Sequence, residues 1–303
     1  MWTASLDGVP VGELRLVTAE LDEQGWSSVW FGEAYGREAL SAAALILSAS
    51  ERMRVGTGIA NIYGRDAVAC AAAARTLHAA HPGRFVLGLG VSHAPLVERM
   101  RGHVYGKPVQ EMAAYLAAVA ATPAVVPGEQ ELPPVVLAAL GPRMLDLARD
   151  DSQGAVPYLV LPSHTAAARE RLGGERQLVV EQAAVISPGL DETEWRRRAY
   201  EHLQLYTGLA NYQASFRRQG FDEADLVRGG SEELKQAMVP FGLAATLERI
   251  QEHLSAGADE VVVQVLGENV LVPPRVDWAL LAKAVRGAPQ QPGSGGLMAA
   301  LSR

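Results

Sequence analysis

Short apolar runs and longer amphipathic stretches alternate along this chain. The short runs end at glycine, proline or polar residues, as buried strands do, while the longer stretches repeat apolar residues every three or four positions, as helices do. In 13–24, Leu14, Val17 and Leu21 share one helical face, and Gly25 stands where a helix ends. The expected strands are 1–5, 27–31, 54–59, 85–89, 135–140, 155–160, 178–186 and 260–266, and the expected helices are 13–24, 38–50, 67–80, 108–121, 143–150, a short one after 165, 243–256 and 276–285.

Roughly eight strands that alternate with helices predict an α/β fold, a (β/α)8 TIM barrel, with an open doubly wound sheet as the alternative. A dinucleotide fingerprint is absent, because Gly88 and Gly90 lack a third glycine and no helix follows directly. We expect one domain over 1–286. Within it, 187–242 is too long for a single crossover and is expected to be an inserted segment that caps the barrel, whether to select substrate or as a plain structural cap. The tail 287–303 is rich in glycine, proline, glutamine and serine, and is expected to be flexible.

Charge and composition narrow the possible partners. The net charge of -7 and a pI near 5.6 disfavour nucleic acid and anionic membranes, which need a basic surface. Cys70 is the single cysteine, so no disulfide framework is expected. The start of the chain lacks a basic region followed by an apolar one, and no apolar run reaches the length of a membrane span. These features predict a soluble, cytoplasmic protein.

Polar residues and glycines follow the expected strands at their carboxyl ends, which meet at one face of a barrel. His93 is a candidate general acid or base, although a histidine bonded to backbone is nearly as good an interpretation. Gly88 and Gly90 would let a flat ligand approach the backbone. The full set at the strand ends is Glu33, then Thr57, Gly58, Ile59, Ala60 and Asn61, then Gly90, Ser92 and His93, then Gly141, then Ser163, His164 and Thr165, then Glu181 and Gln182, and Gln264.

An anion site is the second candidate. Ser163, His164 and Thr165 precede a helix, so their hydroxyls and free N–H groups could bind a phosphate, with an ordinary N-cap as the alternative. Lys107, in a loop after the fourth strand, could complete such a site. No metal site is expected, because His78 and His81 have no carboxylate or cysteine at ligand spacing.

Several stretches resemble the bacterial luciferase-like superfamily, and within it the oxidoreductases that use the deazaflavin coenzyme F420. They are Trp2-Thr3, Trp30 to Glu33, Val55 to Ile62, Gly83 to His93, Arg101 to Pro108, Ala139 to Leu145 and Gly229 to Ser231. The resemblance implies a barrel whose mouth holds the deazaflavin, with FMN as the alternative cofactor, and a non-proline cis peptide that would fall here at Gly58–Ile59. It also implies that Glu33 and His93 are catalytic, that the substrate lies against Trp2, Tyr63, Gln182 and Tyr212, and that the protein is a homodimer.

Three departures from the family pattern modify this expectation. Ala34 and Tyr35 follow Glu33 where many relatives have a histidine that serves alcohol oxidation. Lys107 stands where relatives that bind the flavin phosphate tightly often have arginine, and a lysine lacks the bidentate fork. The residues before the Trp2-Thr3 pair are almost missing, so the first strand is short and the barrel is expected to be open at that seam unless the start lies upstream.

Three hypotheses follow. The first is an F420-dependent oxidoreductase that moves a hydride to or from a small organic substrate with an activated C=C or C=N bond. The second is a monooxygenase that uses reduced FMN. The third, of another class, is a non-catalytic flavin-binding or structural paralogue.

Overall fold

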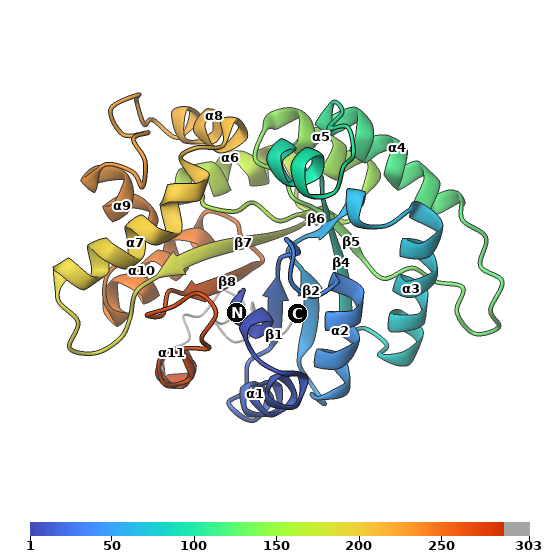
Figure 1. The fold of residues 1–303 in the computed structure, drawn as a ribbon, viewed down its shortest axis with the longest axis horizontal. Helices are drawn as coiled ribbons and strands as arrows, with labels where there is room; N and C mark the ends of the chain where they lie inside the picture. The colour runs from blue at the N-terminus through green and yellow to red at the C-terminus, as the bar shows by residue number, and fades with distance from the viewer. Residues whose placement is uncertain (288–303) are drawn as a thin grey trace.

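Strands and helices alternate through residues 1–287, the part of the chain that the computed structural model describes (Figure 1). The strands are β1 (Ser28–Phe31), β2 (Arg54–Thr57), β3 (Ala60–Asn61), β4 (Phe85–Gly90), β5 (Val135–Leu137), β6 (Gly154–Ala155), β7 (Gln177–Ala184) and β8 (Glu260–Val265). The helices are α1 (Val11–Glu23), α2 (Ala39–Ser48), α3 (Ala67–Ala80), α4 (Pro108–Ala121), α5 (Pro142–Asp151), α6 (Pro162–Leu172), α7 (Glu192–Tyr206), α8 (Ala210–Arg218), α9 (Glu232–Met238), α10 (Leu243–Ser255) and α11 (Arg275–Gly287). The expected tail 287–303 lies almost wholly outside the described residues.

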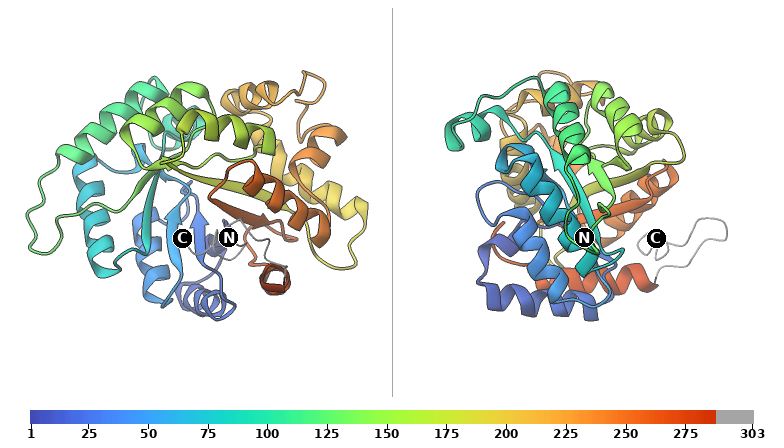
Figure 2. Two further views of the ribbon diagram at one scale, coloured as in Figure 1. Left: turned by 180° about the vertical axis from the view of Figure 1, so that it is seen from behind. Right: turned by 90° about the vertical axis from the view of Figure 1, so that its right-hand side faces the viewer.

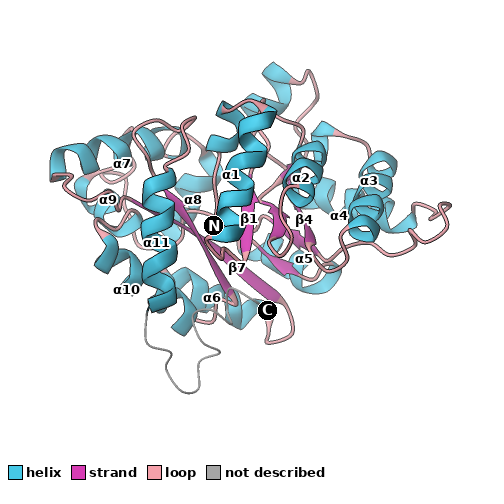
Figure 3. Cartoon of the chain, turned by 90° about the horizontal axis from the view of Figure 1, so that it is seen from below, coloured by secondary structure: helices cyan, strands magenta, loops and turns pink. Residues whose placement is uncertain are grey.

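All strand pairs are parallel, and neighbouring strands follow the order β1-β2-β4-β5-β6-β7-β8, with β3 also paired to β4. The helices lie outside the sheet, as the two further views show (Figure 2). From below, α11 lies beside α1, and Arg275 forms an ion pair with Glu20 there (Figure 3). The predicted α/β TIM barrel is confirmed, and the alternative of an open doubly wound sheet is wrong.

The seam between β8 and β1 is bridged by the first residues. The Trp2 amide donates to the carbonyl oxygen of Val263 at 3.0 Å, and the Trp30 amide donates to that of Met1 at 2.8 Å. A strand over 1–5 is too long a prediction, because only Trp2 pairs with β1 and Ser5–Gly8 winds into a 3-10 helix. The expected opening at this seam is therefore not present, since Trp2 contacts both neighbours.

Helix boundaries follow the predicted caps. The Asp66 carboxylate accepts from the Ala69 amide at 2.9 Å before α3, and the Asp191 carboxylate accepts from the Glu194 amide at 2.9 Å before α7. Gly25 follows α1 with φ +79°, a backbone conformation that favours glycine. None of the described helices has the length and apolar character needed to cross a membrane.

The strands separate two apolar layers. Inside the barrel, one cluster consists of Trp2, Trp30, Val86, Val136, Val156, Val179 and Val262. A larger cluster fills the space between the strands and the outer helices. The amino end of the barrel is closed by polar groups, since Glu260 accepts a hydrogen bond from Ser28 and pairs with Arg54 at 3.2 Å. A ligand is therefore expected at the other end of the barrel, the mouth, which the carboxyl ends of the strands form.

Helices α7, α8 and α9 are inserted between β7 and α10, and they stand at one side of the barrel in yellow and orange (Figure 1). They have a core of their own, which includes Trp195, Leu203, Phe216, Phe221 and Leu234. The same core reaches Leu159 and Ala183, which lie close to the carboxyl ends of β6 and β7. The inserted segment therefore packs against the edge of the mouth.

Candidate active site

Aromatic side chains meet where the barrel mouth faces the inserted helices. Tyr158 lies three residues after the end of β6. Its ring centroid is 5.3 Å from that of Trp2 and also 5.3 Å from that of Tyr206. Tyr212 of α8 lies 4.8 Å from Tyr206 and 5.7 Å from His93. We call these residues, with His202 of α7, the mouth cluster: Trp2, His93, Tyr158, His202, Tyr206 and Tyr212. Three predicted site residues, Trp2, His93 and Tyr212, are brought together here.

The polar atoms of the mouth cluster form a short chain. The Tyr206 hydroxyl donates to the Tyr158 hydroxyl at 3.2 Å, which donates to Oε1 of Gln264 at 2.6 Å. Nε2 of His202 is buried without a partner among residues 1–287. Burial lowers the pKa of His202 to about 4 and also lowers the pKa of His93. Both imidazoles are therefore neutral at neutral pH.

Glu181 of β7 faces this cluster, whereas its neighbour Gln182 does not. Oε2 of Glu181 accepts from the Leu159 amide at 3.2 Å, and burial raises the pKa of the carboxyl to about 8. Gln182 lies on the opposite face of the strand, where its amide donates to the carbonyl oxygen of Met238 at 2.9 Å and accepts from His253 at 3.0 Å. The assignment of Gln182 to the substrate is wrong, because adjacent strand residues point to opposite faces and Glu181 takes the inner one.

Among residues 1–287, two residues other than glycine have left-handed backbones, and both adjoin the mouth. Ser92, directly before His93, has φ +56°, and Leu159 has φ +55°. Such conformations cost roughly 1–3 kcal/mol and concentrate at functional sites. The carbonyl oxygen of Ser92 accepts from the Tyr105 hydroxyl at 3.2 Å, and Glu181 holds the Leu159 amide. The strain supports the mouth as the functional site.

The glycines of β4 are explained by the neighbouring strand. A Cβ on Gly88 would lie 1.7 Å from the carbonyl oxygen of Thr57, and one on Gly90 would lie 2.4 Å from the side chain of Ile59. These contacts within the protein account for glycine at both positions, and the expected approach of a flat ligand to this backbone stays a prediction. The hydroxyl of Thr57 is fully buried and bonded to Gly88, so it does not reach a ligand either.

The loop between β2 and β3 contains the peptide that the family resemblance implies. The Gly58–Ile59 bond is cis, as expected. The indole of Trp2 donates to the Gly58 carbonyl oxygen at 3.3 Å. Ala60 and Asn61 follow in β3, buried beside the last residues of β4. This places the backbone of Gly58 against a member of the mouth cluster.

Glu33 is enclosed by donors of the protein itself. Its carboxylate forms a buried ion pair with Arg65 and accepts from the Asn61 amide at 2.8 Å. Arg65 also pairs with Glu38 at 2.7 Å. With its oxygens engaged in this way, Glu33 is better placed to position the loop after β1 and β3 than to carry a proton.

Tyr63 and Lys107 lie at the rim. The Tyr63 hydroxyl accepts from the Gly106 amide at 3.2 Å, and its ring lies 5.9 Å from that of Tyr105. Tyr63 therefore supports the loop that leads to Lys107. Lys107 is the exposed residue directly before α4. Its carbonyl oxygen accepts from the Glu111 amide at 3.0 Å, while its side chain makes no hydrogen bond or ion pair with another described residue.

The residues of the predicted anion site lie at the starts of α5 and α6, and not all of them are free to meet a ligand. Ser163 is exposed at the second position of α6, and Nε2 of His164 lies 3.1 Å from the Leu140 carbonyl oxygen, beside Gly141. Thr165 is wrong as a ligand, since it is fully buried and its hydroxyl bonds Nδ1 of His253 at 2.8 Å. Sequence reasoning missed Arg218 of α8, whose guanidinium donates to the Leu140 carbonyl oxygen at 3.1 Å.

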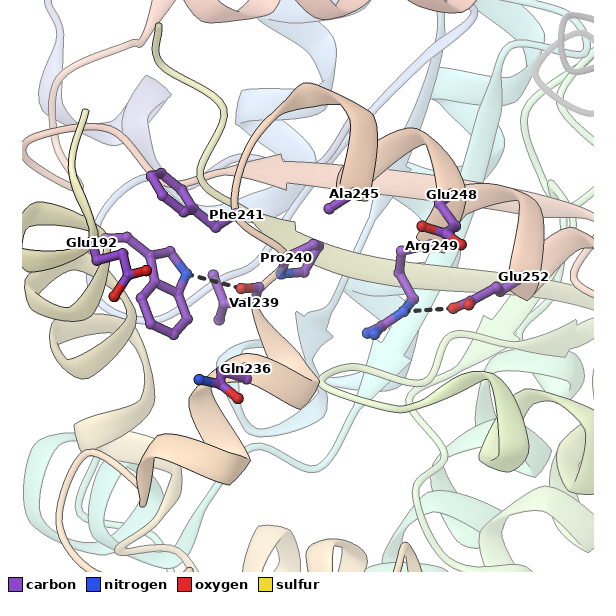
Figure 4. Close-up of a pocket in the computed structure, with 10 residues that line it drawn as sticks. Glu192, Gln236, Val239, Pro240, Phe241, Ala245, Glu248, Arg249 and Glu252 are labelled. Atoms are coloured by element: carbon purple, nitrogen blue, oxygen red, sulfur yellow. Dashed lines mark hydrogen bonds and ion pairs between the residues drawn. The ribbon is translucent and has the colours of Figure 1, made fainter. Parts of the chain in front are cut away.

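A hollow of about 320 Å³ lies between α7, α9 and α10 (Figure 4), and its lining residues include no member of the mouth cluster. Trp195 and Phe241 line it, and the Trp195 indole donates to the Val239 carbonyl oxygen at 2.9 Å. Arg249 forms an ion pair with Glu252 at 2.8 Å.

Among residues 1–287, no three histidine, cysteine or acidic side chains are arranged to bind a metal ion.

A barrel with polar and aromatic groups at the carboxyl ends of its strands is the architecture of a TIM-barrel enzyme with its site at the mouth. The chain belongs to the luciferase-like monooxygenase family, whose profile matches residues 2–275.

Two named relatives match parts of the chain. A protein of Mycobacterium tuberculosis (strain ATCC 25618 / H37Rv), provisionally named as a coenzyme F420-dependent oxidoreductase, is 36% identical over 107 residues, which cover 35% of this chain and 30% of that protein. A 5,10-methylenetetrahydromethanopterin reductase of Methanolobus tindarius is 26% identical over 48% of this chain and 50% of that enzyme. The chain thus matches half or less of the length of these relatives.

Solved structures share the fold over nearly the whole chain. An F420-dependent secondary alcohol dehydrogenase in complex with an F420-acetone adduct has a TM-score of 0.71 at 12% identity, covering 94% of this chain and 97% of that one. The oxygenating constituent of 3,6-diketocamphane monooxygenase of Pseudomonas putida, in complex with FMN, has a TM-score of 0.68 at 13% identity, covering 93% and 94%. At 12–13% identity, these likenesses show that the chain shares its barrel fold with both proteins.

Proposed function

We propose that this protein is an F420-dependent oxidoreductase that transfers a hydride between the deazaflavin and a small organic substrate with an activated C=C or C=N bond. One structural observation supports the proposal: within residues 1–287, a carboxyl oxygen of Glu181 and a ring nitrogen of His202 are buried without hydrogen-bond partners beside the aromatic rings of the mouth. Buried polar atoms normally have partners, so these two mark where a ligand with polar edges binds. The Mycobacterium relative favours the deazaflavin over FMN.

The residues present fit such a cofactor. Trp2, the backbone of Gly58, Ile59, Ala60 and Asn61, and the turn at Gly90 and Ser92 would surround the ring. Ser163 and His164 would bind the phosphate with the N–H groups of α6, beside Gly141, while Arg218 and Lys107 supply positive charge. When bound, the reduced deazaflavin supplies two electrons as a hydride.

His93 is the proposed proton-handling residue. It lies at the end of β4, next to Tyr212, and its lowered pKa keeps it neutral, able to hold a substrate atom by a hydrogen bond or to accept a proton from it. Glu33 would act indirectly, by holding Asn61 and Arg65 in place. Both assignments are proposals.

The proposed substrate is uncharged. The mouth cluster contains aromatic rings and neutral hydrogen-bonding groups but no arginine, lysine or aspartate. Trp2 and Tyr212 would form its walls, with Tyr63 at the rim. We infer that the inserted segment 187–242 caps the mouth, because α7 and α8 contribute His202, Tyr206 and Tyr212.

The second candidate is a monooxygenase that uses reduced FMN, and the fold shared with an FMN-bound monooxygenase favours it. The non-catalytic alternative was based on an incomplete first strand. It has less support because Trp2 bridges the barrel at that position.

A homodimer is proposed from the surface of α3. Val68, Ala69, Ala72 and Ala79 are exposed on this helix, and Val68 is 63% exposed. Small residues allow two helices to approach closely, so this face suits a second copy. Light scattering of the wild type and of Val68→Lys tests it, since the variant should shift toward monomer.

The first experiment titrates the purified protein with oxidised coenzyme F420 and, in parallel, with FMN, following tryptophan fluorescence. Trp2 and Trp30 lie in the inner barrel cluster and should report on a ligand in the mouth. Tighter binding of the deazaflavin supports the proposal, and preference for FMN supports the monooxygenase. Binding of neither would contradict both.

A further inference from the structure

Glu181 is a buried acid whose hydrogen bonding the fold leaves incomplete. The residue is 1% exposed, and the only hydrogen bond of its side chain within residues 1–287 is the one that Oε2 accepts from the Leu159 amide at 3.2 Å. Oε1 has no partner there. A buried polar atom without a partner has lost its hydrogen bonds to water, and proteins tolerate that loss where a ligand or an ordered water supplies the bond.

The direction of the side chain follows from the strand. Val179, two residues earlier, belongs to the inner barrel cluster, so Glu181 also points inward, one layer closer to the mouth. On the adjacent β8, Gln264 stands two residues beyond the inward-facing Val262 and binds the Tyr158 hydroxyl. Glu181 therefore lies on the inner face of the barrel, below the aromatic rings of the mouth cluster.

The surroundings contain no countercharge. The titratable groups that face Glu181 are Tyr158 after β6, Tyr206 of α7 and Tyr212 of α8. Burial raises the pKa of all three phenols, so they are neutral, as is the nearby His202. No described arginine or lysine forms an ion pair with Glu181. Burial raises the pKa of its carboxyl to about 8, so the group carries a proton at neutral pH.

A neutral carboxyl differs from a carboxylate because it has an O–H donor. We propose that Glu181 is a ligand-binding residue of the mouth, where Oε1 donates a hydrogen bond to an acceptor atom, a carbonyl oxygen or ring nitrogen, of the cofactor's heteroaromatic ring. Because the group extends from the inner wall of β7, it meets the ligand that lies deepest, between the strand ends and the inserted helices. This inference rests on the proposed function.

The hydrogen bond makes binding depend on pH. Once Glu181 ionises, it loses the donor and repels the acceptor atom. If only the neutral form binds, the apparent Kd rises about tenfold for each pH unit above the pKa of the carboxyl. A glutamine at this position keeps an N–H donor and cannot ionise.

The test measures the Kd of oxidised coenzyme F420, and separately of FMN, from pH 6 to pH 10 for the wild type, Glu181→Gln and Glu181→Leu. We expect wild-type affinity to fall above pH 8, Glu181→Gln to lack that fall while binding within a few-fold of the wild type at pH 7, and Glu181→Leu to bind weakly throughout. Titration of the ligand itself appears in all variants and cancels. Glu260→Gln is the matched control, since Glu260 is also buried, at the other end of the barrel, and it should retain the wild-type profile.

Infrared spectra of the ligand-free protein give a second readout. A protonated carboxyl band at pH 7 should be present in the wild type and absent in Glu181→Gln. Equal pH profiles for wild type and Glu181→Gln, or the absence of this band, would overturn the role of Glu181 while leaving the proposed function standing. Failure of the wild type to bind either cofactor at any pH would instead overturn the proposed function, and this inference with it.

Discussion

The side chain of Thr57 and the backbone of Gly88 exchange two hydrogen bonds across adjacent strands. The Thr57 hydroxyl donates to the Gly88 carbonyl oxygen at 2.7 Å and accepts from the Gly88 amide at 2.8 Å. The backbone pairs between β2 and β4 end before this point, at Gly56 and Val86. The hydroxyl therefore replaces the backbone ladder directly below the mouth.

Gly88→Ala should destabilise the protein strongly. Its Cβ would meet the Thr57 carbonyl oxygen at 1.7 Å, and backbone cannot move aside without breaking the two hydrogen bonds. We expect a loss of about 3 kcal/mol or more in the free energy of unfolding, measured by urea denaturation. Gly12→Ala is the matched control, because nothing lies within 4 Å of its added Cβ, and it should stabilise α1 by up to about 1 kcal/mol. Equal stability of the two variants would contradict this packing.

Glu33→Gln separates positioning from proton transfer. The substitution removes the buried charge that pairs with Arg65, whose side chain is only 8% exposed, and weakens the bond to the Asn61 amide. We expect unfolding to become easier by about 1–3 kcal/mol, with the Kd of coenzyme F420 changed only a few-fold. Thermal and urea unfolding would be followed alongside the fluorescence titration. Unchanged stability together with abolished turnover would instead make Glu33 catalytic.

His93→Gln tests the proposed proton-handling residue. The variant should bind coenzyme F420 normally and turn over about 100-fold or more slowly, the usual contribution of a general acid or base. Burial lowers the pKa of His93, so the neutral form persists below its ordinary titration range. The wild-type rate should therefore decline only on the acidic side of pH 6.5, and this limb should be absent from the residual rate of the variant. Full activity of His93→Gln would remove the residue from the mechanism.

His253 should make the protein sensitive to acid. It is fully buried between Thr165 and Gln182, and burial, with the charges of Arg249 and His164, lowers its pKa to about 3. Between pH 6.5 and 3 the unfolded chain binds a proton that the folded chain does not, so stability present above pH 6.5 is lost as the pH falls, by up to about 1.4 kcal/mol per unit. Urea unfolding at pH 4, 5, 6 and 7 should show a slope about one proton smaller for His253→Gln. The exposed His103→Gln should keep the wild-type slope, and a reduced slope there would contradict the assignment.

The order and type of the elements could be predicted from the sequence. Short apolar runs marked the strands, and longer stretches with an apolar residue every three or four positions marked the helices. Asp66 and Asp191 marked helix starts through a side-chain acceptor that needs no tertiary information. The ends of β5 and β6 were predicted too far along, since an apolar run continues past Leu137 and Ala155 while the backbone pairs stop.

The side chains of the site were harder to predict. The sequence of a wholly apolar strand does not show which residues face inward, and several site residues are far from the strands in the sequence. Leu178, Val179 and Val180 are all apolar, so their pattern does not show which face is inner, and Gln182 was chosen in place of Glu181. Tyr206, His202 and Arg218 lie on inserted helices whose position over the mouth is set by long-range packing. One local signal existed for Tyr158: it stands two residues after the inward-facing Val156, on the same face.

Trp2 joins the first strand of the barrel to the last one, so closure of the barrel depends on both ends of the chain. Its neighbours are Trp30 and Val263, so one side of this residue can pair as soon as β1 is made, whereas the other must wait until β8 has left the ribosome. If synthesis stopped before β8, the edge of β7 and the free side of Trp2 would have no strand to pair with. Such unpaired strand edges can bind other chains. The completed barrel should therefore form late and cooperatively, after synthesis of its eighth strand.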